Sequence, residues 1–243
     1  MQQHHEFLLI HGSWHTGACW RHVEAVLQAN GHKTHAITLP GHGDGATDVS
    51  LEKYVQAIVD YVDAAALDKF VLVGHSAGGT IVCKAAEKLG DTIARLVLIS
   101  PLLAKDGEAL TQAVPPAYAD LFAQMAAAND NNQIMVPWEV WRDSFIGDAS
   151  EEVARAAFDE LCPEPFGPLT EAVDLSKFAQ LPIAKSYIRC MEDVVFPVGE
   201  FGLFPRMYEQ IAPCRLVNVQ GSHELMYSNP DALADALIKA GRA

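Results

Sequence analysis

Strand-length apolar runs and amphipathic stretches alternate along most of this 243-residue chain. The apolar runs lie at 6–10, 33–39, 70–73 and 93–99. Each run ends within two residues of a glycine or proline, which is typical of a buried strand that enters a turn. Between the runs, apolar residues recur at spacings of three and four, which marks one face of a helix. Strands that alternate with helices predict an α/β fold, in which a mostly parallel sheet is flanked by helices on both faces.

The alternation stops after Pro101 and returns near residue 181. Residues 102–180 contain six prolines with helix-like pieces between them and no clear strand. We therefore expect a mostly helical cap insertion at 102–180, above an α/β core made of residues 1–101 and 181–243. In the second part of the core we expect strands at 183–190 and 216–219, a helix at about 199–211, and a last helix from Asn229.

Charge and composition limit the partners and the location. The net charge of −14 would repel the phosphates of nucleic acid and the surface of an anionic membrane, so we expect neither as a partner. The five cysteines are scattered without a C-x-x-C pair, which predicts reduced and mostly buried thiols. The first residues lack a signal-peptide pattern, and no apolar run approaches the roughly 20 residues that span a bilayer. We expect a cytoplasmic protein.

The segment Gly74-His75-Ser76-Ala77-Gly78 matches the G-x-S-x-G pattern of a nucleophile elbow. It follows an apolar strand and opens an amphipathic helix, which is the setting that such an elbow requires. A serine at a helix N-terminus lies where free amides favour developing negative charge. We expect Ser76 to be a nucleophile; the structural alternative is a glycine-rich turn with a capping serine.

A serine hydroxyl needs a neighbouring base to become a good nucleophile. His223 is the one histidine that follows Ser76 in the sequence, and it comes just after the strand expected at 216–219. An acid that orients this histidine should follow an earlier strand, and Asp193 does so. Glu192 beside it and the more distant Asp174 are the alternatives.

The loop after the first strand, His11-Gly12-Ser13, is placed to form an oxyanion hole. We expect its two amides to come from Ser13 and Ala77, with Gly12 allowing substrate to approach the backbone. Aromatic residues of the cap could line the substrate pocket, and Phe122, Trp138 and Phe145 are our candidates.

No metal or cofactor motif is complete. His223-Glu224 begins like the zinc helix H-E-x-x-H, but Tyr227 stands where the second histidine would be. The alternating glycines Gly41, Gly43 and Gly45 form no phosphate-binding unit. We expect chemistry without a cofactor or metal.

These motifs resemble the plant methylesterase and hydroxynitrile lyase family of α/β-hydrolases and its bacterial esterase, pyrethroid-hydrolase-like relatives. The matching segments are FLLIHGSWHTGACW, GHKTHAITLPGHG, VLVGHSAGG, SYIRCMED and GSHELMYSNP. The resemblance implies the α/β-hydrolase fold with a cap and often a homodimer. It also implies a triad of Ser76, Asp193 and His223, with oxyanion amides from Ser13 and Ala77.

Two positions distinguish activities within the family. The branch similar to cyanohydrin-cleaving enzymes carries a threonine where this chain has Gly12, and a lysine where it has Glu224. A carboxylate beside the base would repel cyanide rather than stabilise it. Plant methylesterases tend to carry an apolar residue at the Glu224 position.

The sequence therefore predicts a carboxylesterase that acts through an acyl-enzyme. The substrates expected from the resemblance and the aromatic cap are small lipophilic or aromatic esters, methyl esters included. Three alternatives remain on the same fold: a hydroxynitrile lyase-like activity, a cofactor-free oxygenase, and a small-ligand receptor.

Overall fold

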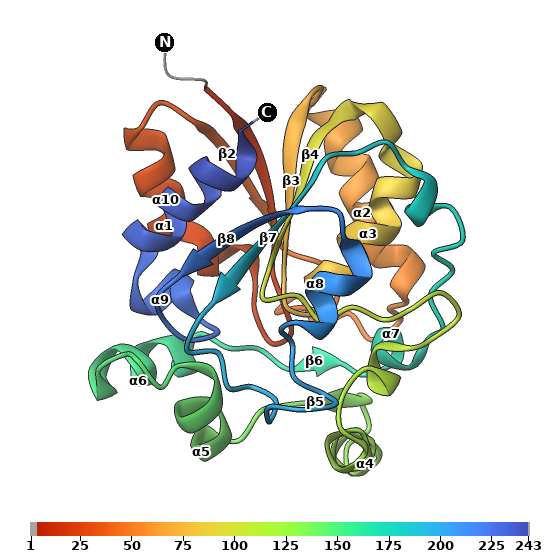
Figure 1. Ribbon diagram of the computed structural model, residues 1–243. Helices are drawn as coiled ribbons and strands as arrows, with labels where there is room; N and C mark the ends of the chain where they lie inside the picture. The colour runs from red at the N-terminus through yellow and green to blue at the C-terminus, as the bar shows by residue number, and fades with distance from the viewer. Residues whose placement is uncertain (1–3, 243) are drawn as a thin grey trace.

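A six-stranded sheet forms the centre of the computed structural model, which describes residues 4–242 (Figure 1). Its strands are β1 (Glu6–Ile10), β2 (Lys33–Ile37), β3 (Phe70–His75), β4 (Ile93–Ile99), β7 (Lys185–Cys190) and β8 (Arg215–Val219). They are arranged in the order β2-β1-β3-β4-β7-β8, and every neighbouring pair is parallel. The predicted parallel sheet is confirmed.

Helices cover both faces of the sheet, because the side chains of each strand alternate between two apolar cores. Phe7 and Leu9 of β1 pack into one core with α1 (Arg21–Ala29), α9 (Leu225–Ser228) and α10 (Pro230–Gly241). Leu8 and Ile10 pack into the other core with α2 (Leu51–Ala64), α3 (Gly78–Leu89) and α8 (Arg206–Ile211). Strands buried on both faces explain the continuous apolar runs in the sequence. The described residues also form four short 3₁₀ helices: η1 (Gly17–Trp20), η2 (Gly90–Thr92), η3 (Leu110–Gln112) and η5 (Phe178–Gln180).

The boundaries of α8 and α10 test the sequence prediction. Asn229 caps α10 by accepting a hydrogen bond from the Ala232 amide at 3.1 Å, as its position before Pro230 predicts. The helix expected from residue 199 is wrong in its first half, because α8 begins only at Arg206. Gly199 has φ of +133°, which no right-handed helix accommodates, and Pro205 directly precedes the helix.

Most of residues 102–180, which we propose as the cap, lies at the end of the sheet toward which the β7 and β8 arrows point, whereas η5 lies beside α3 (Figure 1). The segment contains α4 (Pro116–Ala127), α5 (Trp138–Val140), the π-helical turn η4 (Trp141–Phe145), α6 (Glu151–Asp159) and α7 (Gly167–Thr170). It also contains an antiparallel pair, β5 (Gln133–Ile134) with β6 (Glu164–Pro165). The expectation of no strand here was wrong, because strands of two residues leave no periodic pattern in the sequence.

Two further expectations concern thiols and membranes. All five cysteines are free; four are buried and Cys214 is half-buried, so the prediction of reduced, mostly buried thiols is confirmed. Within residues 4–242, every helix is too short or too polar to cross a bilayer.

The strand order also fixes where a site can form. The chain leaves β1 for α1 on one face of the sheet, and it leaves β3 for α3 on the opposite face. Neighbouring parallel strands whose connections diverge in this way leave a crevice at their carboxyl ends. The loop that contains Gly12 and Ser13 and the turn that contains Ser76 both border this crevice.

Candidate active site

Ser76 lies in a strained turn between β3 and α3. Its φ is +50°, a left-handed conformation that costs a non-glycine residue about 1–2 kcal/mol. The turn is tight because α3 starts against the loop after β1 (residues 11–14, the oxyanion loop). A Cβ at Gly78 would lie 2.4 Å from the backbone oxygen of His11. Strain of this kind persists only where surrounding contacts fix the backbone, and it exposes the serine at the helix start.

A single methyl group should therefore damage this turn. We expect Gly78→Ala to lower the free energy of unfolding by about 2–3 kcal/mol, because the backbone of His11 cannot move aside. Urea denaturation measures the loss. Gly147→Ala is the matched control, since its Cβ would meet nothing closer than 3.5 Å, and we expect a change within about 0.5 kcal/mol. Equal stability of the two variants would contradict the tight packing at Gly78.

His223 and Asp193 form a buried pair at the carboxyl ends of β8 and β7. Nδ1 of His223 donates to Oδ2 of Asp193 at 2.7 Å, and Asp193 also accepts from the Val195 amide at 3.1 Å. The Nε2 atom of His223 has no hydrogen-bond partner among the described residues, and the imidazole lines the same cavity as Ser76. An imidazole held in this tautomer keeps its Nε2 lone pair free to accept a proton.

The electrostatics of this pair follow from burial and mutual attraction. Burial alone would lower the pKa of His223, but the Asp193 carboxylate and its hydrogen bond outweigh it, so the pKa of His223 is raised. Burial likewise favours the neutral acid at Asp193, and attraction to His223 outweighs it, so the pKa of Asp193 is lowered.

The two alternative acids lie elsewhere. Glu192 points to the surface and accepts from the side chain of Gln220. Asp174 is exposed and pairs with Lys84 at 3.5 Å. Of the three carboxylates weighed from the sequence, the structure brings only Asp193 to His223.

The loop after β1 passes directly over the nucleophile. Within residues 4–242, no hydrogen bond occupies the backbone amide of Ser13 or of Ala77, and both residues line the cavity with Ser76. Gly12 differs from our expectation, because it is not among the cavity-lining residues. A Cβ at Gly12 would lie 2.8 Å from the Cβ of Ser76, so the glycine makes room for the serine.

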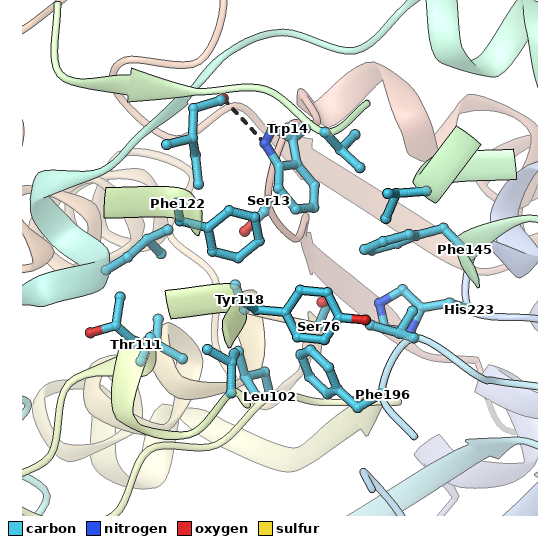
Figure 2. A pocket seen from close by; sticks show the side chains of 18 of the residues that line it. Ser13, Trp14, Ser76, Leu102, Thr111, Tyr118, Phe122, Phe145, Phe196 and His223 are labelled. Carbon is cyan, nitrogen blue, oxygen red and sulfur yellow. Dashed lines mark hydrogen bonds between the residues drawn. The ribbon is translucent and has the colours of Figure 1, made fainter. Parts of the chain in front are cut away.

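An apolar cavity opens in front of Ser76, between the core loops and the cap (Figure 2). Its walls are mainly aliphatic and aromatic, and they include Leu110, Leu121, Phe122, Val140, Phe145 and Phe196. Ser13, Ser76, Thr111, Tyr118 and His223 are the polar residues of the lining. Among the described residues around this cavity, His223 is the one acidic or basic side chain.

Of the three cap aromatics expected in the pocket, Phe122 and Phe145 line it and Trp138 does not. The Trp138 ring packs against Phe158 with a centroid separation of 5.4 Å, and the Arg155 guanidinium lies 3.5 Å above it. Attraction between the guanidinium and the ring holds Trp138 at the outer side of the cap, so Trp138 packs within the cap and does not line the pocket. Trp14, which was not selected from the sequence, lines the cavity instead.

Three further side chains lie behind the pair in contacts that were not predicted from the sequence: His75 and Glu224 are buried, and Asp148 is exposed. Nε2 of His75 donates to the backbone oxygen of His223 at 3.1 Å. Asp148 of the cap accepts from the Ser222 amide at 3.0 Å, which holds the same loop from the other side. Glu224 is buried, with Oε2 3.3 Å from Nε2 of His15, and attraction to His15 outweighs burial and lowers the pKa of Glu224 to about 2.

One group of side chains in the described part of the chain has metal-ligand spacing. Ligand atoms of His75, His223 and Glu224 lie within 4.8 Å of one another. Glu224 is paired with His15, a contact that a metal would have to displace, whereas His223 keeps its Nε2 atom free and lines the cavity with Ser76. The arrangement suits proton transfer by His223 better than metal binding.

Comparison with known proteins defines the family. The model of the alpha/beta hydrolase family matches residues 7–236, nearly the whole chain. The chain belongs to the alpha/beta hydrolase family. The resemblance in its motifs and its predicted fold are thereby confirmed.

Two bacterial relatives match this hydrolase over nearly its full length. It is 27% identical to the carbendazim hydrolyzing esterase of Nocardioides sp. strain SG-4G, with 97% of this chain and 99% of that one covered. It is 28% identical to the pyrethroid hydrolase of Sphingobium wenxiniae, with 96% and 86% covered. Similarity also extends to putative methylesterases of Arabidopsis thaliana, at 27% identity in one case, which covers 96% of this chain and 56% of the relative.

Solved structures agree with these sequence relatives. An extracellular alpha/beta-hydrolase from a Paenibacillus species, described as sharing structural and functional homology with tobacco salicylic acid binding protein 2, superposes with a TM-score of 0.95. It is 33% identical, and the match covers 98% of this chain and 100% of that one. A pyrethroid hydrolase from Sphingobium faniae superposes with a TM-score of 0.78 at 26% identity and 98% coverage of both chains. Since the first of these proteins is extracellular, the cytoplasmic location stays a prediction.

Proposed function

We propose that this protein is a carboxylic ester hydrolase that works through an acyl-enzyme on Ser76. The observation that carries the proposal is the 2.7 Å hydrogen bond between Asp193 and His223, beside a strained serine in an apolar cavity. Buried carboxylate, histidine and elbow serine form the constellation that activates a hydroxyl for acyl transfer. The esterase and pyrethroid hydrolase names of the full-length relatives support the same reaction class.

The geometry suggests how each step would proceed. Ser76 Oγ attacks the ester carbonyl carbon while its proton moves to Nε2 of His223, and Asp193 stabilises the imidazolium. The free amides of Ser13 and Ala77 stabilise the oxyanion. The intermediate collapses, and the leaving alkoxide takes the proton from His223. Water then attacks the acyl group with His223 as base, which releases the acid and restores Ser76.

The cavity lining supports neutral, lipophilic substrates. A charged substrate group would lose its water there without an oppositely charged partner, which is strongly unfavourable. The same argument disfavours a receptor for small acids, because His223 is the one basic side chain in the described lining and it is already paired with Asp193. The same apolar lining also favours release of the charged acid product after hydrolysis.

A matched pair of esters tests this proposal. p-Nitrophenyl butyrate and p-nitrophenyl hemisuccinate have acyl chains of equal length that end in a methyl group and a carboxylate. We expect kcat/KM for the hemisuccinate to be lower by about 100-fold or more, since the carboxylate is buried unpaired. If the protein hydrolysed neither of the two esters, the esterase proposal would be contradicted. Equal rates for the two esters would contradict the preference for neutral substrates.

A further inference from the structure

The backbone of Trp14 is held in an unusual conformation by the cap. Its φ is +66°, which a tryptophan adopts only where its surroundings impose it. The Trp14 amide donates to Oε2 of Glu164 at 3.0 Å, and its carbonyl oxygen accepts from the Cys162 amide at 2.8 Å. Its indole Nε1 donates to the backbone oxygen of Ile134 at 3.2 Å, the bond drawn in Figure 2.

Among the described residues, Glu164 is the one whose side chain forms a hydrogen bond to the backbone of Trp14. It belongs to β6, its side chain is 2% exposed, and the same Oε2 atom also accepts from Nε2 of His42 at 2.8 Å. Nδ1 of His42 lies 3.3 Å from the carbonyl oxygen of Leu39, so both ring nitrogens of His42 face oxygen atoms. The buried carboxylate thus has two donors, one from the core loop after β2 and one from the oxyanion loop.

The hydrogen bond from the Trp14 amide to Glu164 acts on the proposed oxyanion hole through the neighbouring residue, Ser13. Trp14 directly follows Ser13, whose amide is one of the two proposed oxyanion donors. The Trp14 amide belongs to the Ser13–Trp14 peptide plane, and the Ser13 amide belongs to the adjoining Gly12–Ser13 plane. Fixing the first plane therefore leaves the Ser13 amide to turn only about the bonds of the Ser13 Cα, which limits its direction. A donor that is misplaced relative to the oxyanion loses much of its effect on the transition state.

We infer that Glu164, paired with His42, is a positioning residue that holds the oxyanion loop in the geometry that acyl transfer requires. Through Glu164, the cap helps to position the oxyanion hole. The inference rests on the proposed function, because it concerns an oxyanion that forms only in acyl transfer. Glu164 itself touches no substrate and does not line the cavity. It acts through the backbone of Trp14.

The test compares Glu164→Ala with Glu164→Gln and with a second cap carboxylate. Glu160 lies four residues earlier and pairs with Arg21 of α1 at 2.6 and 2.7 Å, so it also joins the cap to the core but does not contact the oxyanion loop. We expect Glu164→Ala to lower kcat for p-nitrophenyl butyrate by about 10- to 100-fold with little change in KM. Glu164→Gln keeps an acceptor for the Trp14 amide and should retain most activity. Glu160→Ala should change kcat by less than about two-fold.

Inhibitor binding separates positioning from a general loss of structure. An alkyl trifluoromethyl ketone adds to the serine and develops an oxyanion, whereas the matching methyl ketone fills the same cavity without doing so. Glu164→Ala should weaken the trifluoromethyl ketone by about the same factor as kcat and leave the methyl ketone unchanged. Equal weakening of both ketones, or weakening of neither, would overturn the inference.

Amide hydrogen exchange gives a readout that does not depend on turnover. Exchange in the peptide that covers residues 11–16 should accelerate in Glu164→Ala and stay at the wild-type rate in Glu160→Ala. Unchanged exchange in Glu164→Ala would overturn the positioning role even if the wild type is an active esterase. Absence of wild-type turnover together with accelerated exchange would instead reject the proposed function and, with it, the oxyanion role.

Discussion

Replacing Ser76 with alanine should reduce ester turnover by about a million-fold, because the acyl-enzyme can no longer form. The serine occupies its strained elbow for reasons of backbone packing, so we expect the alanine variant to fold and bind substrate normally. The measurement is kcat for p-nitrophenyl butyrate, with Kd for the matching methyl ketone as a check on the cavity. If Ser76→Ala retained even a hundredth of the wild-type rate, covalent catalysis by this residue would be wrong.

The second large effect is expected at Asp193. Asp193→Asn should lower kcat by about 10,000-fold, because an amide no longer fixes the His223 tautomer or stabilises its imidazolium. The same change should alter the pH dependence. His223 acts as a base when neutral, so wild-type activity falls as the pH drops through its raised pKa.

The direction of that shift follows from the causes that act on His223. Burial favours neutral His223, whereas attraction to Asp193 and, less strongly, to Glu224 favours the imidazolium. Without the Asp193 carboxylate, burial is opposed only by the weaker attraction to Glu224, so the acidic limb of the pH profile should move to lower pH in Asp193→Asn. Glu192→Gln is the matched control, since Glu192 contacts Gln220 at the surface, and its profile should equal that of the wild type. An acidic limb that stays in place in Asp193→Asn would contradict the pairing.

The triad candidates could be selected from the sequence because each follows a strand. Parallel strands bring their carboxyl ends to one edge, so Ser76 after β3, Asp193 after β7 and His223 after β8 had to come close together. The glycines of the elbow were equally predictable, since the helix start leaves no room for a side chain at Gly78.

Contacts made by the cap could not be predicted in the same way. Glu164 and Trp14 are 150 residues apart, and no local pattern relates a two-residue strand to a loop in the core. Trp138 was expected in the pocket because aromatic residues commonly line pockets, but its partner Arg155 keeps it on the outer side of the cap. Periodicity shows that a side chain is apolar, and only packing decides which apolar surface it joins.

Covalent labelling tests the central claim most directly. The protein would be treated with an alkyl fluorophosphonate and analysed by intact-protein mass spectrometry and peptide mapping, with Ser76→Ala treated in parallel. An activated nucleophile predicts one adduct per chain, located on Ser76, with loss of esterase activity in proportion to labelling and no adduct in the variant. An unlabelled protein, or an adduct on another residue that appears equally in Ser76→Ala, would contradict covalent catalysis by Ser76.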